Sequence, residues 1–185
     1  MPQISRFPLH DELSAPDGSL PVLRGVLSTA DRVPNFIGVL AGSPAALRGY
    51  ARLWAELHHG SLDAGTLERI AVAVAEHHGS GRGVVLHGQP VRDVGLTPDE
   101  VGAARQFSSA LPEQAALLRL LEVIVTRPGP PPEHLLEEAR DLGWTDEQLL
   151  EAIAVVALET FTALVTVAGD VPVDASGEAA RLITA

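Results

Sequence analysis

Apolar residues recur at intervals of three and four positions from about residue 20 onward, and this spacing is typical of amphipathic helices. The clearest example is the segment 44–58, where one helix face carries Leu47, Tyr50, Leu53, Trp54 and Leu57. No segment shows the alternation of apolar and polar residues that marks a strand. We therefore predict an all-α fold, a bundle of several helices.

The first 20 residues differ in composition from the rest of the chain. Residues 1–20 are rich in Pro, Ser, Asp and Gly, a composition that favours an extended arm. Residues 21–185 are expected to form a single helical domain, because 185 residues with 46% hydrophobic content suit one compact core. Aromatic residues make up only 4% of the chain, which also favours packed helices over a β-sandwich.

Capping residues predict where the helices begin. Asn35 is expected to cap a short apolar helix, and Ser43, Asp63 and the Thr97–Glu100 and Thr145–Gln148 capping boxes precede four longer ones. The turn at residues 78–81 should join the helix after Asp63 to a helix over residues 82–94. We expect these two helices to pack antiparallel.

One segment resembles another within the chain. Glu, Ile, Ala, Val and Glu occur in the same order in residues 68–76 and 151–159. Two explanations remain open. Ala- and Val-rich helices can resemble each other by chance, or the fold consists of two related helical halves about a pseudo-dyad.

The charge of the chain excludes several classes of partner. The net charge is −11, and all 13 basic residues are arginines. Nucleic acid and acidic membrane surfaces are therefore not expected as partners, since both require neutralisation of phosphates. The chain contains no cysteine, which excludes thiol catalysis, disulfides and zinc–thiolate sites. The apolar stretches 70–75 and 153–158 are too short to span a bilayer, and no signal peptide is evident, so we expect a cytoplasmic protein.

Glu68 and His87 are the strongest candidates for catalysis. They lie on consecutive predicted helices, about 17 Å and about 11 Å from the middle of the turn at 1.5 Å per residue. The long glutamate side chain and slack in the loop could close this mismatch of about 6 Å, so a glutamate–histidine pair for acid–base chemistry can form directly or through one water. The alternative is an ion pair that only holds the helices together. Arg82, at the start of the second helix, is a candidate anion contact, or else a solvated surface residue.

The remaining histidines have weaker interpretations. His58 and His59, like His77 and His78, lie near predicted helix C-termini, where an imidazole can bond the last carbonyls. His77, His78 and His87 with Glu68 lack the spacing of known zinc motifs, so no metal or other cofactor is expected. A nucleophilic pair of Ser80 and His87 lacks an orienting third residue.

Residues 67–87, LERIAVAVAEHHGSGRGVVLH, resemble the core of alkylhydroperoxidase D (AhpD)-like proteins and carboxymuconolactone decarboxylases. Members of this family typically read Glu-Arg, an apolar helix, then Cys-x-x-Cys-x-x-x-His. Residues 5–8 and 33–36 resemble the branch known as peroxidase-related proteins, so the resemblance covers nearly the whole chain. It implies an AhpD-like helical bundle with two pseudo-repeated halves.

The resemblance matches some functional residues of the family and lacks others. Glu68 matches its relay glutamate and His87 its motif histidine. The two motif cysteines are replaced by Ser80 and Gly83, and neither residue can supply the thiolate that the family's peroxidase cycle requires. Thiol peroxidase activity is therefore not expected.

Two functions remain open. The first is a thiol-independent acid–base enzyme of lyase or decarboxylase type, with catalytic Glu68 and His87 and with a small organic acid bound by Arg82, His78 and Ser80. The second is an inactive relative of the family that serves as a small-molecule binding or oligomeric scaffold protein.

The resemblance also implies a homo-oligomer, with trimer or hexamer favoured and dimer as the alternative. Independently, the helix around residues 153–167 carries little polar surface, with Leu158, Phe161, Leu164 and Val165 spread around it. A second copy could cover part of this helix. The alternative is a central helix that is covered by its own chain.

Overall fold

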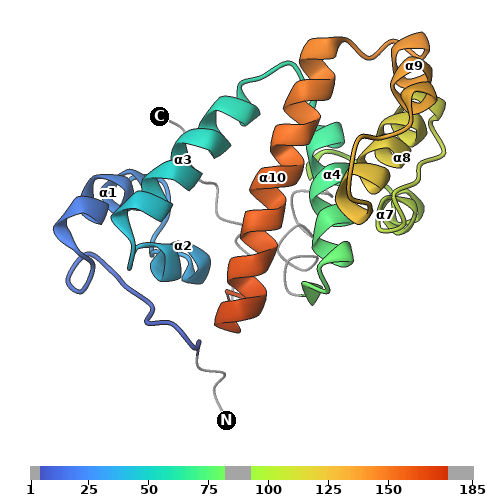
Figure 1. Ribbon diagram of the computed structural model, residues 1–185. Coiled ribbons are helices and arrows are strands. Elements are labelled where there is room, and N and C mark those ends of the chain that lie inside the picture. Colours follow the sequence, from blue (N-terminus) through green and yellow to red (C-terminus); the bar gives the residue numbers. More distant parts are fainter. Residues whose placement is uncertain (1–4, 82–92, 175–185) are drawn as a thin grey trace.

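The computed structural model describes residues 5–81 and 93–174, and every regular element within these ranges is a helix (Figure 1). The N-terminal part comprises the short 3-10 helix η1 (Asp17–Ser19) and the helices α1 (Leu20–Leu27), α2 (Asn35–Leu40) and α3 (Pro44–His58). The all-α prediction is confirmed. The predicted helix over residues 82–94 and its antiparallel packing lie outside the described residues, apart from its last two positions.

The second part of the bundle begins with α4 (Ala64–His77). After it come α7 (Pro98–Ala104), α8 (Pro112–Thr126), α9 (Glu133–Asp141) and the long α10 (Asp146–Gly169). In Figure 1, α10 runs through the middle of the molecule, with α1, α2 and α3 on one side and α4, α7, α8 and α9 on the other. It packs on α3, α4 and α8, most extensively on α4.

The helices α4 and α10 run in the same direction. Glu151, near the start of α10, accepts hydrogen bonds from the backbone of Ser61 (2.8 Å) and Leu62 (3.2 Å), just before α4. At the other end, His78 Nε2 lies 3.3 Å from Thr160 Oγ1. The two segments that resemble each other in sequence, residues 68–76 and 151–159, are therefore neighbours at the centre of the fold.

The helix α10 is both the central helix and a partly exposed one. Its length and its mean hydropathy of 1.9 over 18 residues would suffice for a membrane span, but 44% of that window is buried inside the bundle. Leu158 is buried, whereas Leu150, Ile153, Leu164 and Val167 are 68%, 37%, 55% and 49% exposed. Among the described residues, α10 is therefore buried on one side and leaves these four apolar side chains at the surface.

The predicted helix starts are largely confirmed. Ser43 Oγ accepts a hydrogen bond from the N–H of Ala46 (3.3 Å), and Asp63 Oδ1 accepts one from that of Thr66 (3.0 Å). Both halves of the capping box at Thr145 are present. At Thr97 only one half forms, because the Glu100 side chain turns away to other partners.

The prediction for Asn35 was wrong. Asn35 is the first residue of α2 rather than its cap, and its backbone N–H donates to the Asp174 carboxylate at 3.2 Å. Asn35 Nδ2 donates to the carbonyl of Pro172 (3.1 Å), and Arg32 forms an ion pair with Asp174 (3.2 Å). A segment that lies far away in the sequence therefore caps α2.

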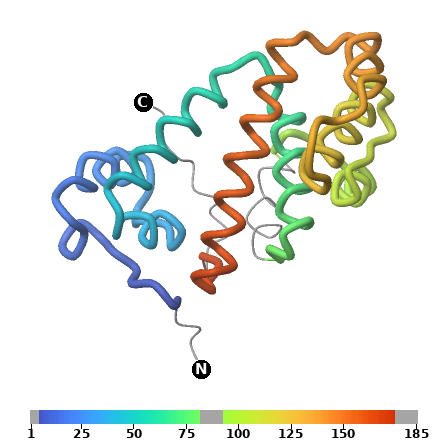
Figure 2. Tube along the Cα trace, viewed as in Figure 1, coloured from blue at the N-terminus to red at the C-terminus, as the bar shows by residue number. Residues whose placement is uncertain are grey.

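The N-terminal arm is held against the bundle. Residues 5–16 contain no helix and run beneath α2 to the end of α10 (Figure 2). The N–H of His10 donates to the carbonyl of Gly38 (3.0 Å), and that of Arg6 to the carbonyl of Gly169 (2.7 Å). A Cβ atom on Gly38 would lie 3.0 Å from the carbonyl oxygen of His10, so the arm approaches α2 closely at this glycine.

Candidate functional site

The helix α4 presents Glu68 at the edge of the core. Its residues 69–75 are all buried, whereas Glu68 is partly exposed and takes part in further interactions. Asp63 holds the start of the helix, because its carboxylate accepts bonds from both the backbone N–H and the hydroxyl of Thr66. Burial raises the pKa of Asp63, but these hydrogen bonds outweigh it, and the pKa lies below its ordinary value.

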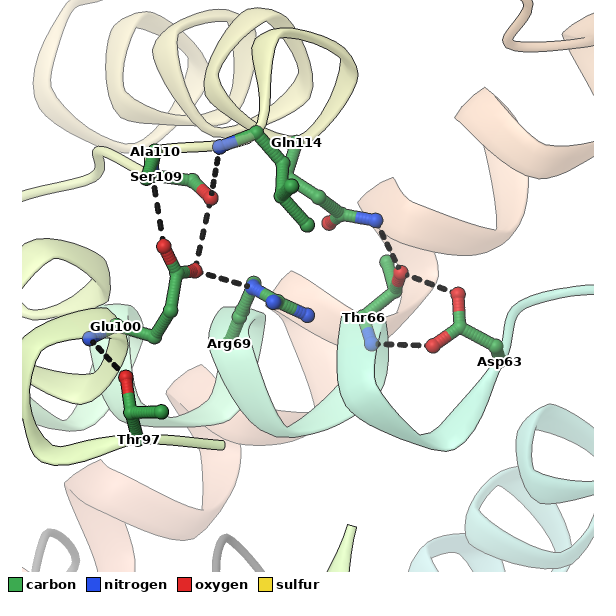
Figure 3. Close-up of polar contacts among 9 residues, drawn as sticks. Asp63, Thr66, Arg69, Thr97, Glu100, Ser109, Ala110 and Gln114 are labelled. Carbon is green, nitrogen blue, oxygen red and sulfur yellow. Dashed lines mark hydrogen bonds and ion pairs between the residues drawn. The ribbon is translucent and has the colours of Figure 1, made fainter. Parts of the chain in front are cut away.

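A buried ion pair fixes the rotation of α4 next to Glu68. Arg69 Nε donates to Glu100 Oε2 at 3.1 Å, and the two side chains are only 8% and 15% exposed (Figure 3). Glu100 also accepts hydrogen bonds from the N–H of Ala110 (3.0 Å) and the hydroxyl of Ser109 (2.9 Å). The bond from Ala110, then those from Ser109 and Arg69, lower the pKa of Glu100 despite its burial.

A second polar chain joins α4 to α8. Gln114 Nε2 donates to Thr66 Oγ1 (2.8 Å), and Thr66 Oγ1 donates to Asp63 Oδ2 (2.6 Å), as Figure 3 shows. Thr66 is fully buried and Gln114 is 7% exposed. Buried hydrogen bonds of this kind leave α4 little freedom to rotate, so the direction in which Glu68 leaves the helix is fixed.

The end of α4 brings His78 and Ser80 toward α10. Gly79, with φ +64°, reverses the chain, and the N–H of Ser80 bonds the carbonyl of Ala75 at 2.8 Å, which closes a Schellman motif. Ser80 is only 2% exposed. His78 contacts Thr160, and burial, then the neighbouring His77, lowers its pKa.

The other predicted site residues cannot be placed. Arg82, Gly83 and His87 lie outside the described residues, so the pairing of Glu68 with His87 stays a prediction. In the described ranges, no group of three or more His, Asp or Glu side chains is arranged to hold a metal ion.

The structure adds residues that the sequence analysis did not assign to the site. His58 at the end of α3 bonds the Trp54 carbonyl through Nδ1 (2.8 Å), and His59 bonds that of Ala55 (2.7 Å), as predicted for helix C-termini. The negative charges of Glu159 and Glu68 also act on His58. In the sequence, only the four-residue spacing of Tyr50, Trp54 and His58 indicates that they share one face of α3. Nothing in the sequence links that face to Glu159.

Glu159 is the buried carboxylate of this group. It is 8% exposed on α10 and lies close enough to Tyr50 that its charge, after burial, raises the pKa of that phenol. The charges of Glu159 on α10 and Glu68 on α4 therefore both favour the protonated form of His58 on α3, although burial outweighs them, and we call these three residues the Glu68–His58–Glu159 cluster.

A separate cleft of about 240 Å³ opens at the other side of the end of α4. The ion pair between Arg105 and Glu76 (2.9 Å) lies at its wall. Phe107, which also lines the cleft, follows the end of α7 with a left-handed φ of +50°, and its buried ring packs against His77. Glu122 adds a second carboxylate to the lining of this cleft.

Comparisons with known proteins agree with this fold. Residues 44–126 match the Carboxymuconolactone decarboxylase family. An AhpD-core, uncharacterised peroxidase-related protein from Ralstonia eutropha JMP134 superposes with a TM-score of 0.80 at 23% identity, over 94% of each chain. A peroxidase-related protein from Silicibacter sp. TM1040 gives 0.77 at 20% identity, over 95% of this chain and 93% of the other.

A third solved structure is a debrominase. The debrominase Bmp8, as a cysteine-to-alanine variant in complex with 2,3,4-tribromopyrrole, gives a TM-score of 0.73 at 18% identity, over 95% of this chain and 94% of the other. No curated protein matches the sequence. The resemblance stated from the sequence is confirmed: this protein matches the carboxymuconolactone decarboxylase family over residues 44–126 and has the AhpD-like helical fold over almost its whole length.

Proposed function

We propose that the protein is a thiol-independent acid–base enzyme of lyase or decarboxylase type, which acts on a small organic acid through Glu68 and His87. The observation that supports this most is the Glu68–His58–Glu159 cluster, in which a partly exposed carboxylate acts on an imidazole at the surface. Proton transfer to and from a carbon next to a carbonyl requires a positioned base and acid, and it requires neither a thiol nor an electron acceptor.

The similarity in fold to a protein that binds a small molecule supports a small-molecule substrate. The debrominase of the same fold has been observed with a small halogenated pyrrole. Arg82 is the proposed contact for the negative charge of the substrate, with His78 and Ser80 as further binding residues. The buried position of Ser80 favours a role in shaping the site over direct attack on a substrate.

Substrate depletion tests this function. We expect one or more members of a panel of lactones and 3-oxo acids to be consumed by the wild-type protein. Glu68→Gln and His87→Ala should each lower kcat/KM by about 10²- to 10⁴-fold, the usual contribution of a general acid or base. Glu56→Gln, an exposed glutamate on α3, is the matched control and should retain the activity.

The alternative function is a binding or oligomeric scaffold without turnover. The exposed apolar positions of α10 favour this alternative specifically, because they offer a surface for a second copy. Ligands that raise the melting temperature but are never consumed would support it. Consumption that Glu68→Gln leaves unchanged would contradict the role of Glu68.

A further inference from the structure

The cleft beside the end of α4 lies where three helices end. Residues 76 and 77 belong to the last turn of α4, residues 105–107 directly follow α7, and Glu122 and Thr126 lie in the last turns of α8. The backbone carbonyls at a helix C-terminus together carry about half a negative charge. The ends of α4, α7 and α8 therefore all favour a positive charge in this cleft.

The arginine of the cleft is already paired. Arg105 Nε and one of its terminal nitrogens both bond Glu76 Oε2, each at 2.9 Å. Within the described ranges, the other carboxylate oxygen of Glu76, Oε1, accepts no hydrogen bond. The charge of Arg105 is therefore balanced, so little attraction is left for an anionic ligand, while Glu76 Oε1 can still accept.

Glu122 supplies a carboxylate without a counter-ion. In the part of the chain that the structure describes, its side chain forms neither an ion pair nor a hydrogen bond. One turn further along α8, the Thr126 hydroxyl donates to the Glu122 backbone carbonyl (2.7 Å), and its oxygen keeps lone pairs that can accept. Gln106 adds an amide to the lining. The cleft thus offers several acceptors and one uncompensated negative charge.

Two rings supply the apolar part of the lining. The buried ring of Phe107 and the ring of His77 meet edge to face, with their centroids 6.3 Å apart. The volume of the cleft is about 240 Å³. This is below the roughly 300–1,000 Å³ of sites for drug-sized molecules, so the cleft suits a ligand of only a few heavy atoms.

We propose that this cleft is a second ligand site, which binds a small primary alkylammonium ion with Glu122 as its counter-ion and with the alkyl chain against Phe107 and His77. A primary ammonium group carries one positive charge and three N–H donors, which match the acceptors of the cleft. This chain contains no lysine, so the side chains of a second copy cannot supply such a group. The cleft is separate from the proposed acid–base site, and its ligand needs no turnover.

Binding of butylamine to the full chain tests this site. At pH 8 an alkylamine remains protonated, whereas histidine side chains are ordinarily neutral. Butylamine should shift the backbone ¹H–¹⁵N signals of residues 76–77, 105–107 and 122–126 in a saturable manner, and butanol and butyrate should not. Shifts that spread over the whole surface without saturation, or binding of butyrate at these residues, would overturn the proposal.

Three charge variants identify the counter-ion. Glu122→Gln should weaken the binding of butylamine by about 5-fold or more, because it removes the charge and keeps the shape. Arg105→Gln should strengthen binding, because it releases the Glu76 carboxylate. Glu113→Gln, nine residues earlier on α8 and outside the lining of the cleft, is the matched control and should leave the affinity unchanged. Equal weakening by Glu122→Gln and Glu113→Gln, or weaker binding by Arg105→Gln, would overturn the proposal.

Two further measurements complete the test. The melting temperature of each variant checks its folding, and Glu122→Gln should stay close to the wild type because Glu122 is exposed. If that variant is unfolded, Gln106→Ala takes its place and should also weaken the binding of butylamine. A lysine-containing peptide that binds while butylamine does not would assign the cleft to a protein partner and overturn the small-molecule ligand.

Discussion

Arg69 is a cation among the apolar residues of α4, and its charge is balanced by a residue from another helix. Glu100 lies 3.1 Å away and receives further bonds from Ser109 and the backbone of Ala110. A buried ion pair adds little net stability relative to apolar residues, but losing one partner leaves a buried charge uncompensated. The stability of α4 therefore depends strongly on Glu100.

We expect Glu100→Gln to lower the free energy of unfolding by about 3 kcal/mol, because Arg69 then remains charged and unbalanced. Urea unfolding at pH 7 measures this change. Glu138→Gln is the control, because its pair with Arg119 is exposed on both sides and should contribute less than about 1 kcal/mol. If both variants lost the same free energy of unfolding, burial would not be the reason that Arg69 needs its partner.

The pH dependence of stability should carry the signature of Glu100. Its pKa is lower in the folded than in the unfolded chain, so the unfolded state binds more protons as the pH falls. Its stabilisation is therefore complete above about pH 4.5 and is lost as the pH falls through the lowered pKa. Unfolding measured from pH 7 to pH 3 should show a shallower loss in Glu100→Gln than in the wild-type protein.

At the scale of elements, the two capping boxes behave differently. Thr145 and Gln148 satisfy each other's backbone groups at the start of α10. Thr97 bonds the N–H of Glu100, but the Glu100 side chain is used by Arg69. In a capping box, the side chain of the third residue after the cap bonds back to the cap's backbone. This second bond forms at Thr145, and it is missing at Thr97 because Arg69 engages the Glu100 side chain.

Thr145→Ala should lower the free energy of unfolding by about 1 kcal/mol, since it removes the N-cap of α10. Thermal or urea unfolding measures the loss. Thr126→Ala is a matched control at the exposed C-terminus of α8, where the hydroxyl bonds only the carbonyl of Glu122. A loss at Thr126 as large as that at Thr145 would show that capping is not the cause.

At the scale of the whole molecule, α10 has apolar side chains that the described part of the chain leaves exposed. Leu150, Ile153, Leu164 and Val167 are all exposed, with Ala157 and Thr160 between them at spacings of three and four residues. This spacing is typical of a seam between packed helices. We therefore propose that the protein forms a homo-oligomer through α10. The resemblance to the AhpD-like family favours a trimer or hexamer, with a dimer as the alternative.

Light scattering at micromolar concentration should give a mass that is a multiple of 19.4 kDa. Leu164→Glu should shift the mass toward the monomer, because it places a charge in the seam. Leu142→Glu, on an exposed residue after α9, is the control and should not change it. A wild-type mass near 19.4 kDa that persists as the concentration rises would contradict this proposal.

The chain should also lack thiol-dependent peroxidase activity with any reductant. It contains no cysteine, and the position of the second motif cysteine is occupied by Gly83. Peroxide consumption in the presence of a dithiol, followed on metal-free protein, is the measurement. Consumption above the rate without protein would show that another group reduces peroxide.

The sequence by itself determined the helices and the loss of the thiols. Spacing of apolar residues and local caps such as Ser43, Asp63 and Thr145 depend on neighbours within four positions, so they can be read without a structure. The candidate Glu68 came from its position on such a helix. Its expected partner His87 lies outside the described residues, so that pairing remains a prediction.

Only the tertiary structure decided which distant residues meet. Asp174 caps α2 in place of Asn35, and Glu100 leaves its capping box for Arg69. Each of these contacts joins segments that lie far apart in the sequence. Their partners are set by how the helices pack, because long-range contacts follow from the whole core and not from the few residues around any one position.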